Sequence, residues 1–207
     1  MAADDPRARA YFNFGPNVWP AGPPEFRAVM ERYFAAMPEV SETLLRGLAL
    51  SLDLPETHFA DFAQDASATL RLLHYPPQPA NPEPGEKGCG AHTDFGALTL
   101  LLQDDVGGLQ VWDHADAWID ARPIEGAYVV NLGDLIARWT NGRYRSTRHR
   151  VINSSGRERY SAPFFFVGNP QQRIEPLPGC LREGETPLHP PVTVDAHVRE
   201  RYAATYG

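Results

Sequence analysis

The length and composition of the chain are those of one globular domain. It has 207 residues, of which 43% are hydrophobic and 22% are charged, and these proportions exclude collagen-like, coiled-coil and disordered proteins. The 19 Lys and Arg residues against 26 Asp and Glu residues give a net charge of −7, which argues against nucleic acid or an anionic membrane as a partner. The polar first residues and the lack of an apolar run of about 20 residues predict a cytoplasmic protein.

The first third of the chain carries the pattern of helices. Between residues 24 and 54 the apolar side chains recur at spacings of three and four, which is the period of an amphipathic helix. Pro38 falls within this stretch, either inside one helix or between two. We therefore expect residues 1–68 to form a helical amino-terminal segment.

Short β-type segments alternate with turn clusters in the rest of the chain. The expected strands cover residues 70–75, 98–102, 109–112, 128–131, 149–152 and 160–167, and one helical turn covers 134–139. The proline-rich stretch 76–90 is expected to be a surface loop. Short strands without βαβ alternation indicate a mainly β fold with flanking helices. We expect residues 69–175 to form this core and residues 176–207 to form a carboxy-terminal extension.

His92-Thr93-Asp94 is the candidate centre of the chemistry. On a strand, residues two apart share one face, so the imidazole of His92 and the carboxylate of Asp94 are expected to hold one cation. A second triplet, His114-Ala115-Asp116, has no histidine at a comparable later interval and is expected to be a loop. His149, 55 residues after Asp94, completes a set of two histidines and one carboxylate. Such a set is typical of non-haem Fe(II) oxygenases and of some zinc hydrolases, and the residues alone leave both open.

A second motif, Arg159-Tyr160-Ser161, follows His149 by ten residues. On a strand, Arg159 and Ser161 share a face, where a guanidinium fork and a hydroxyl can bind one carboxylate. We expect the strands of His149 and Arg159 to form an antiparallel hairpin around residues 153–156. For both side chains to face one cavity, this hairpin needs an odd number of loop residues or a β-bulge.

Together these residues resemble the Fe(II)- and 2-oxoglutarate-dependent dioxygenases, in the isopenicillin N synthase-like branch. The two motifs and His149 occur in the order and at the intervals typical of that family. Further similar stretches extend the resemblance over about residues 24–167: Arg71-Leu72-Leu73-His74-Tyr75-Pro76, Gly108-Leu109-Gln110-Val111, Asn131-Leu132-Gly133-Asp134 and Asn141-Gly142-Arg143-Tyr144-Arg145-Ser146. The resemblance implies a double-stranded β-helix, or jelly roll, around the metal. Family members usually carry a longer amino-terminal segment, so residues 1–68 are expected to be a truncated form of it.

The resemblance also implies roles for individual residues and cofactors. The implied ligands of Fe(II) are His92, Asp94 and His149. The implied contacts of 2-oxoglutarate are Arg159 and Ser161 at its distal carboxylate, with Tyr75 nearby. With O₂ as the oxidant, the implied reaction is hydroxylation or desaturation of a small organic substrate, with release of succinate and CO₂.

Three other interpretations remain open at the level of sequence. An oxidase like isopenicillin N synthase uses the same metal ligands without 2-oxoglutarate, and its Arg-x-Ser pair binds the carboxylate of the substrate. The others are a non-catalytic metal-binding protein and a zinc hydrolase. For the oxygenase and the oxidase alike, Arg71, which shares a strand face with Tyr75, and Phe165 are expected to contact the substrate.

Several conspicuous side chains are expected to serve the fold instead. His74 has the opposite strand parity to Tyr75, so it should face away from the site. The tryptophans expected in the core are Trp112, Trp118 and Trp139.

Overall fold

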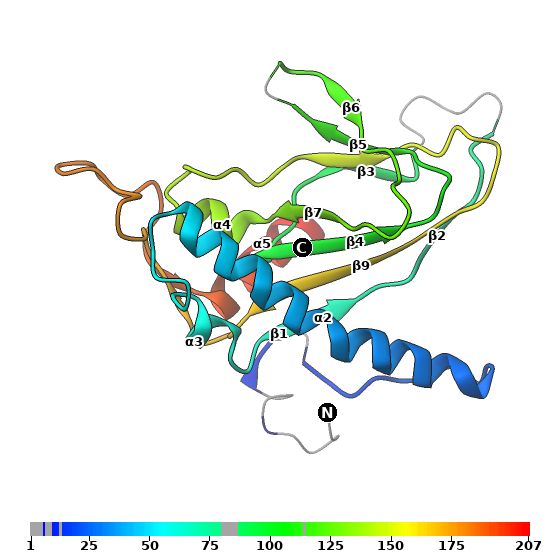
Figure 1. Ribbon diagram of the computed structural model, residues 1–207, viewed down its shortest axis with the longest axis horizontal. Helices are drawn as coiled ribbons and strands as arrows, with labels where there is room; N and C mark the ends of the chain where they lie inside the picture. Colours follow the sequence, from blue (N-terminus) through cyan, green and yellow to red (C-terminus); the bar gives the residue numbers. More distant parts are fainter. Residues whose placement is uncertain (1–5, 7–9, 13, 80–86, 114) are drawn as a thin grey trace.

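Two antiparallel sheets lie face to face at the centre of the computed structural model (Figure 1). The structure describes residues 6, 10–12, 14–79, 87–113 and 115–207. The larger sheet has the order β1 (Ser67–Leu70), β9 (Arg159–Gly168), β4 (Leu98–Gln103) and β7 (Val129–Leu132), and β2 (Leu73–Tyr75) also pairs with β9. The smaller sheet has the order β3 (Cys89–His92), β8 (His149–Val151), β5 (Leu109–Trp112) and β6 (Trp118–Asp120). This is the mainly β architecture that the sequence predicts.

A long helix, α2 (Pro24–Ser51), crosses the outer face of the larger sheet (Figure 1). Its buried residues recur every four positions, which gives it one apolar face: Met37, Ser41, Leu45 and Ala49. The ring of Phe34 packs edge-on against Phe164 of β9, with ring centroids 5.4 Å apart. Pro38 lies inside this single helix, so the packing of the apolar face outweighs the cost of a proline in the helix interior.

The hydrophobic core lies between the helices and the larger sheet. Trp139 ends α4 (Asp134–Trp139) and packs against two phenylalanines. Phe59 directly precedes α3 (Ala60–Ala63) and Phe62 lies within it, and their ring centroids are 5.1 and 5.0 Å from that of Trp139. Gly168 has a φ of +96°, and a Cβ there would overlap the ring of Phe62, so only glycine fits this position. Each fully buried side chain of this size contributes about 1.5–3 kcal/mol to the fold.

The order of the strands corrects one prediction. Strands β8 and β9 do not form a hairpin, because β8 pairs with β3 and β5 whereas β9 pairs with β1, β2 and β4. The chain between them therefore passes from the smaller sheet to the larger one, as consecutive strands do in a jelly roll. The expected register between His149 and Arg159 was wrong for this reason, and His149 instead lies opposite His92 and Val111.

Smaller differences concern where the elements begin and end. The strand predicted at 70–75 is interrupted after Leu70, so β1 and β2 each make their own pairing with β9. Cys89 and Gly90, predicted as the end of a loop, begin β3. Four elements carry no pattern that predicted them: β6, β10 (Arg173–Ile174), β11 (Val192–Thr193) and the final helix α5 (Val194–Tyr206).

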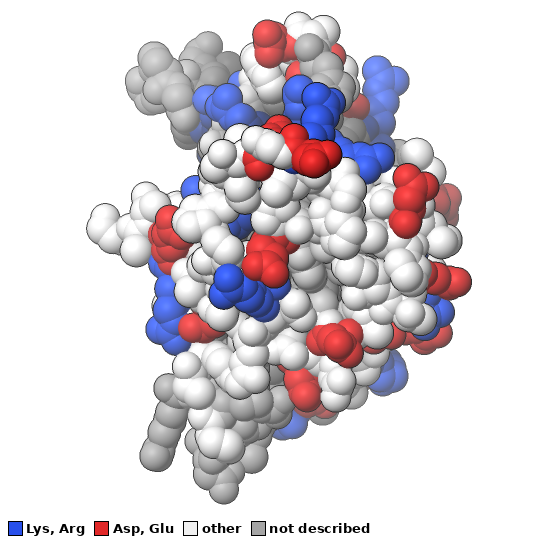
Figure 2. Space-filling model, turned by 90° about the vertical axis from the view of Figure 1, so that its left-hand side faces the viewer, with Lys and Arg blue, Asp and Glu red and all other residues white. Residues whose placement is uncertain are grey.

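The tryptophans divide between the two parts of the fold. Trp139 is buried in the core as predicted, whereas Trp112 and Trp118 are half-buried and pack edge-on against each other on the smaller sheet. No helix in the described ranges has the length and apolar character that a membrane span requires. Acidic and basic side chains are interspersed over the face shown in Figure 2.

Candidate active site

The two histidines and the aspartate of the predicted triad come together at one end of the smaller sheet. His92 ends β3 and lies directly opposite His149, which begins β8. The Nε2 atoms of His92 and His149 lie 3.9 and 3.7 Å from Oδ1 of Asp94. One ligand atom from each residue lies within 4.8 Å of the others, so a single ion can contact all three.

Asp94 reaches this point from a loop and not from a strand. The prediction that His92 and Asp94 share a strand face was wrong, because β3 ends at His92 and the chain then crosses to the larger sheet. The loop is fixed by its backbone, since the carbonyl of Asp94 accepts from the Asp134 amide at 2.8 Å. A Cβ on Gly133 would overlap the backbone oxygen of Gly96, so the absence of a side chain at Gly133 permits this close approach.

Neighbouring residues prepare the carboxylate of Asp94 for a cation. The side chain is 5% exposed, and its Oδ2 accepts hydrogen bonds from the Thr99 hydroxyl at 2.6 Å and from the Asn131 amide at 2.9 Å. Thr99 and Asn131 lie opposite each other on β4 and β7. These contacts leave Oδ1 facing the histidines, an arrangement that orients a metal-binding carboxylate.

The two imidazoles are also oriented by the backbone. Nδ1 of His92 lies 2.8 Å from the Gly90 carbonyl, and Nδ1 of His149 lies 3.0 Å from the Thr147 carbonyl. A carbonyl only accepts hydrogen bonds, so each Nδ1 carries a proton, and in the neutral ring the Nε2 lone pair is free for a metal. In the metal-free protein, contact with the Cys89 sulfur is the main factor that raises the pKa of His92 to about 9, against an opposing effect of burial.

Arg159 lies on the larger sheet and is completely buried. Its guanidinium donates to the Gly107 carbonyl at 2.6 Å, and to the side chains of Ser161 and Gln103, each at 3.2 Å. The ring of Tyr75 lies 4.9 Å from Cζ. All these partners are neutral, and Arg159 forms no ion pair within the described part of the chain. Burial lowers its pKa, and a buried cation of this kind favours an anionic ligand.

An inner cavity of about 330 Å³ joins the triad to this arginine. Both sheets contribute to its walls: the three predicted metal ligands come from the smaller sheet and its loop, and Tyr75, Arg159 and Ser161 come from the larger sheet. The structure therefore brings together every residue predicted for the metal and for 2-oxoglutarate. It does so across the gap between the sheets and not along a hairpin.

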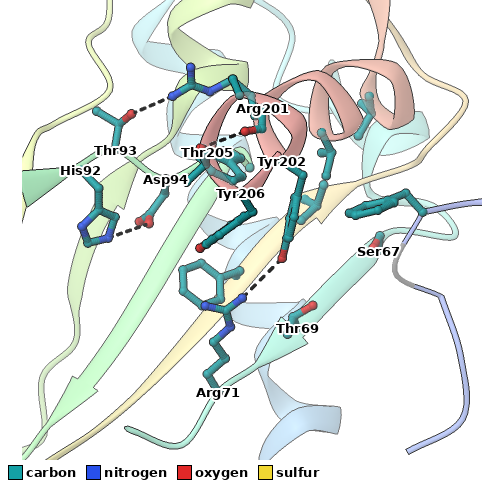
Figure 3. A pocket seen from close by; sticks show the side chains of 18 of the residues that line it. Ser67, Thr69, Arg71, His92, Thr93, Asp94, Arg201, Tyr202, Thr205 and Tyr206 are labelled. Atoms are coloured by element: carbon teal, nitrogen blue, oxygen red, sulfur yellow. Dashed lines mark hydrogen bonds and ion pairs between the residues drawn. The ribbon is translucent and has the colours of Figure 1, made fainter. Parts of the chain in front are cut away.

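An outer cavity of about 720 Å³ opens beside His92 and Asp94, two of the predicted metal ligands. The two cavities share His92 and Asp94 in their walls, together with Arg71, Cys89 and Phe165, so the two predicted substrate residues lie at their junction. Much of the outer cavity is lined by the unpredicted helix α5 (Figure 3).

Helix α5 also holds the loop of Asp94 in place. Nε2 of the buried His197 lies 3.2 Å from the Phe95 carbonyl. Nε of Arg201 lies 2.9 Å from Oδ2 of Asp134, and its guanidinium lies 5.2 Å from the ring of Phe95. Burial, aided by the charge of Arg138, lowers the pKa of His197, so this imidazole is neutral at neutral pH.

The remaining candidates belong neither to the triad nor to the group around Arg159, although His74 is part of the wall of the inner cavity. His74 stacks on Tyr160 with ring centroids 4.7 Å apart, and its Nε2 lies 3.5 Å from Glu158, which is the outward orientation that its strand parity predicts. Asp116 lies between β5 and β6 with a φ of 56°, as expected for a turn. His114 lies outside the described residues.

Comparison with known proteins is consistent with this geometry. Residues 66–168 match the model of the 2OG-Fe(II) oxygenase superfamily. A 2-oxoglutarate-Fe(II) type oxidoreductase (hxnY) of Emericella nidulans is 52% identical over 200 residues, which cover 94% of this chain and 57% of that protein. A homoarginine-6-hydroxylase of Oryza sativa is 37% identical over 93% of this chain and 60% of its own length. The crystal structure of a full-length Neurospora crassa protein in complex with alpha-KG and 5-formyluracil superposes with a TM-score of 0.88, at 33% identity, over 99% of this chain and 67% of that one.

The chain belongs to the superfamily of 2-oxoglutarate- and Fe(II)-dependent oxygenases. This confirms the predicted resemblance and the jelly roll, and it argues against the zinc hydrolase. The chain spans between 57% and 64% of the lengths of the first curated relatives that it matches.

Proposed function

We propose that the chain carries the catalytic core of an oxygenase that uses Fe(II), O₂ and 2-oxoglutarate to oxidise a small organic molecule, with release of succinate and CO₂. The observation that supports this most directly is the buried Arg159, which has no ion-pair partner among the described residues and faces the His92, Asp94 and His149 cluster across one cavity. A dicarboxylate of the size of 2-oxoglutarate links a cation at one end of such a cavity to a metal at the other.

The donor set fits Fe(II). Two neutral imidazoles and one carboxylate leave three coordination positions open, which suits a metal that must take a chelating co-substrate and O₂. When bound, iron with O₂ supplies the oxidising power of the reaction, and the protein supplies binding and orientation. In this proposal His92, Asp94 and His149 hold the metal, with Thr99 and Asn131 fixing the carboxylate.

The residues of the larger sheet bind the co-substrate. Arg159 and Ser161 donate to its distal carboxylate, and the ring of Tyr75 supports the guanidinium from one side. Burial raises the pKa of Tyr75, so its phenol keeps its proton at neutral pH and donates a hydrogen bond. The apolar walls exclude water, and this strengthens the attraction between the carboxylate and Arg159.

The substrate binds in the outer cavity. Arg71 and Phe165 stand where this cavity meets the metal ligands, so both contact the substrate close to the reacting position. We propose that residues 69–175 are the oxygenase core, that residues 176–207 complete the outer cavity with α5, and that within residues 1–68 the helix α2 supports the larger sheet.

The test is reconstitution of the anaerobically purified protein with Fe(II), followed by addition of 2-oxoglutarate and O₂. We expect succinate to form, slowly without a substrate and faster with one, and an Asp94→Ala variant to form none. O₂ consumption that is independent of 2-oxoglutarate would favour the oxidase. Iron binding without either reaction, across a broad substrate screen, would favour the non-catalytic protein.

A further inference from the structure

The outer cavity holds positive charge that its acidic residues do not neutralise. Among the described residues three arginines line it, and Arg201 is ion-paired with Asp134 at 2.9 Å. Arg71 and Arg148 form no ion pair with any part of the chain that the structure describes. Besides the proposed metal ligand Asp94, the acidic residue that lines this cavity in the described part of the chain is Asp195, which is ion-paired with Arg199 at 2.6 Å. The charge that these described residues leave for a ligand to meet is therefore positive.

Arg71 is placed to share an anion with a neighbouring hydroxyl. Its Nη2 donates to the hydroxyl oxygen of Tyr202 at 3.4 Å, and the ring of Phe165 lies 5.6 Å from Cζ. Figure 3 shows Arg71 and Tyr202 meeting in the cavity that His92 and Asp94 also line. Since the Tyr202 oxygen accepts from Arg71, its own proton remains free for another acceptor. The guanidinium and this hydroxyl together present two donors, which match the two oxygens of a carboxylate.

Aromatic rings surround this pair. Tyr202 packs edge-on against Phe12 and Phe95, with ring centroids 4.7 and 5.6 Å apart, and its ring lies 5.3 Å from that of Tyr206. All four rings line the cavity. Such walls offer both faces and edges to a flat ligand, and aromatic pairs gain stability beyond the area that they bury. A cavity of about 720 Å³ accommodates a ligand of one or two rings.

We propose that the outer cavity binds a small planar aromatic carboxylate. Arg71 and Tyr202 hold its carboxylate, and its ring lies against the aromatic walls beside the proposed iron site. As the identity of a substrate, this inference rests on the proposed function. A site for an uncharged heteroaromatic ring would not need the positive charge of Arg71, so this charge favours an aromatic acid over a neutral ring.

The test is calorimetric titration of the protein loaded with Mn(II) and saturating 2-oxoglutarate, without O₂. The probes are benzoate and 1-naphthoate, their uncharged amides, the non-planar cyclohexanecarboxylate, and thymine. We expect at least one aromatic acid to bind about tenfold or more tightly than its amide and than the non-planar acid. Arg71→Gln should abolish the preference for the acid, and Tyr202→Phe should reduce it. Arg173→Gln, which removes an exposed arginine outside both cavities, should change nothing.

The same experiment separates this inference from the proposed function. Titration of 2-oxoglutarate into the Mn(II)-loaded protein tests the proposed function alone. If 2-oxoglutarate does not bind, the proposed function is refuted, whatever the aromatic acids do. If 2-oxoglutarate binds normally, either of two results overturns the inference. The first is that the aromatic acids do not bind, and the second is that the amides or thymine bind as tightly as the acids. If Arg71→Gln weakens 2-oxoglutarate and leaves the aromatic acid unchanged, Arg71 belongs to the inner cavity and the inference is also wrong.

Discussion

Replacement of Arg159 by Leu should weaken the binding of 2-oxoglutarate and leave the metal in place. The lost contact is a charge-assisted hydrogen bond to a carboxylate, worth about 1.5–3 kcal/mol, which corresponds to a rise in Kd of roughly 10- to 150-fold. The substitution also leaves the acceptors on Gly107, Gln103 and Ser161 without their donor, so the variant should unfold at a lower temperature even without ligand.

The stabilisation that 2-oxoglutarate provides is therefore the quantity to measure. At a concentration of 100 times Kd, a ligand stabilises the folded state by about 2.7 kcal/mol, and in a chain of this length that raises Tm by roughly 5–10 °C. We expect this shift in the Mn(II)-loaded natural protein. At the same concentration the shift in Arg159→Leu should fall to about half or less, because the ligand concentration then exceeds Kd by only about tenfold or less and the stabilisation grows with the logarithm of that ratio.

Two further variants control the measurement. Arg159→Lys keeps a charge but loses the planar fork, so its shift should be intermediate. Arg157→Gln removes an exposed arginine that pairs with Asp105, and its shift should equal that of the natural protein. A full shift in Arg159→Leu, with an unchanged half-saturating concentration, would refute the assignment of Arg159 to 2-oxoglutarate and would favour the oxidase.

Three other predictions concern the metal. The double variant His92→Ala, Asp94→Ala should bind no Fe(II) in equilibrium dialysis, because one histidine does not retain a labile divalent ion, whereas His114→Ala should bind it normally; the opposite result would mean that the second triplet is the site. Gly133→Ala should lower Fe(II) affinity and Tm together, since its Cβ would displace the loop of Asp94; an unchanged dissociation constant would contradict this. Because the pKa of metal-free His92 is about 9, Co(II) must displace a proton below that pH, so affinity should rise with pH up to about 9. Cys89→Ala removes the main cause of this shift, and a pH profile of Co(II) binding that it does not move to lower pH would count against the effect.

The residues of the site were predictable because their chemistry depends on residue type and interval. His92, Asp94, Arg159 and Ser161 stand in two short motifs, His149 lies between these motifs, and the resemblance to a family supplied the roles of all five residues. Their spatial arrangement was not predictable from local pattern, since a loop of similar length can close a hairpin or cross between two sheets. The strand-parity argument assumed the hairpin and so failed, although the side chains that it placed in one cavity do line one cavity.

The parts of the fold that the sequence did not reveal have weak local signals. Strands β10 and β11 have two residues each, which is too few for an alternating pattern. Helix α5 lacks a clear apolar face, because only two of its residues, Val194 and His197, are buried, and its polar and apolar residues are mixed along the helix. Its one signal is Thr193, whose hydroxyl caps the helix by accepting from the Ala196 amide. Thr99, which fixes Asp94, looks like any other residue of a buried strand.

The inner cavity lies between the two sheets, whereas the outer cavity is lined largely by α5. In the proposed function, binding of the co-substrate and choice of the substrate therefore depend on different structural elements. The spacing between the triad and Arg159 is set by the distance between the two sheets, and in the proposed function it must match a co-substrate of constant length. The walls that a substrate meets come largely from α5 and from aromatic residues near the amino terminus, such as Phe12 and Phe14. In the proposed function, substitutions in those walls can therefore change which substrates bind, while the spacing between the triad and Arg159 that fits 2-oxoglutarate stays the same.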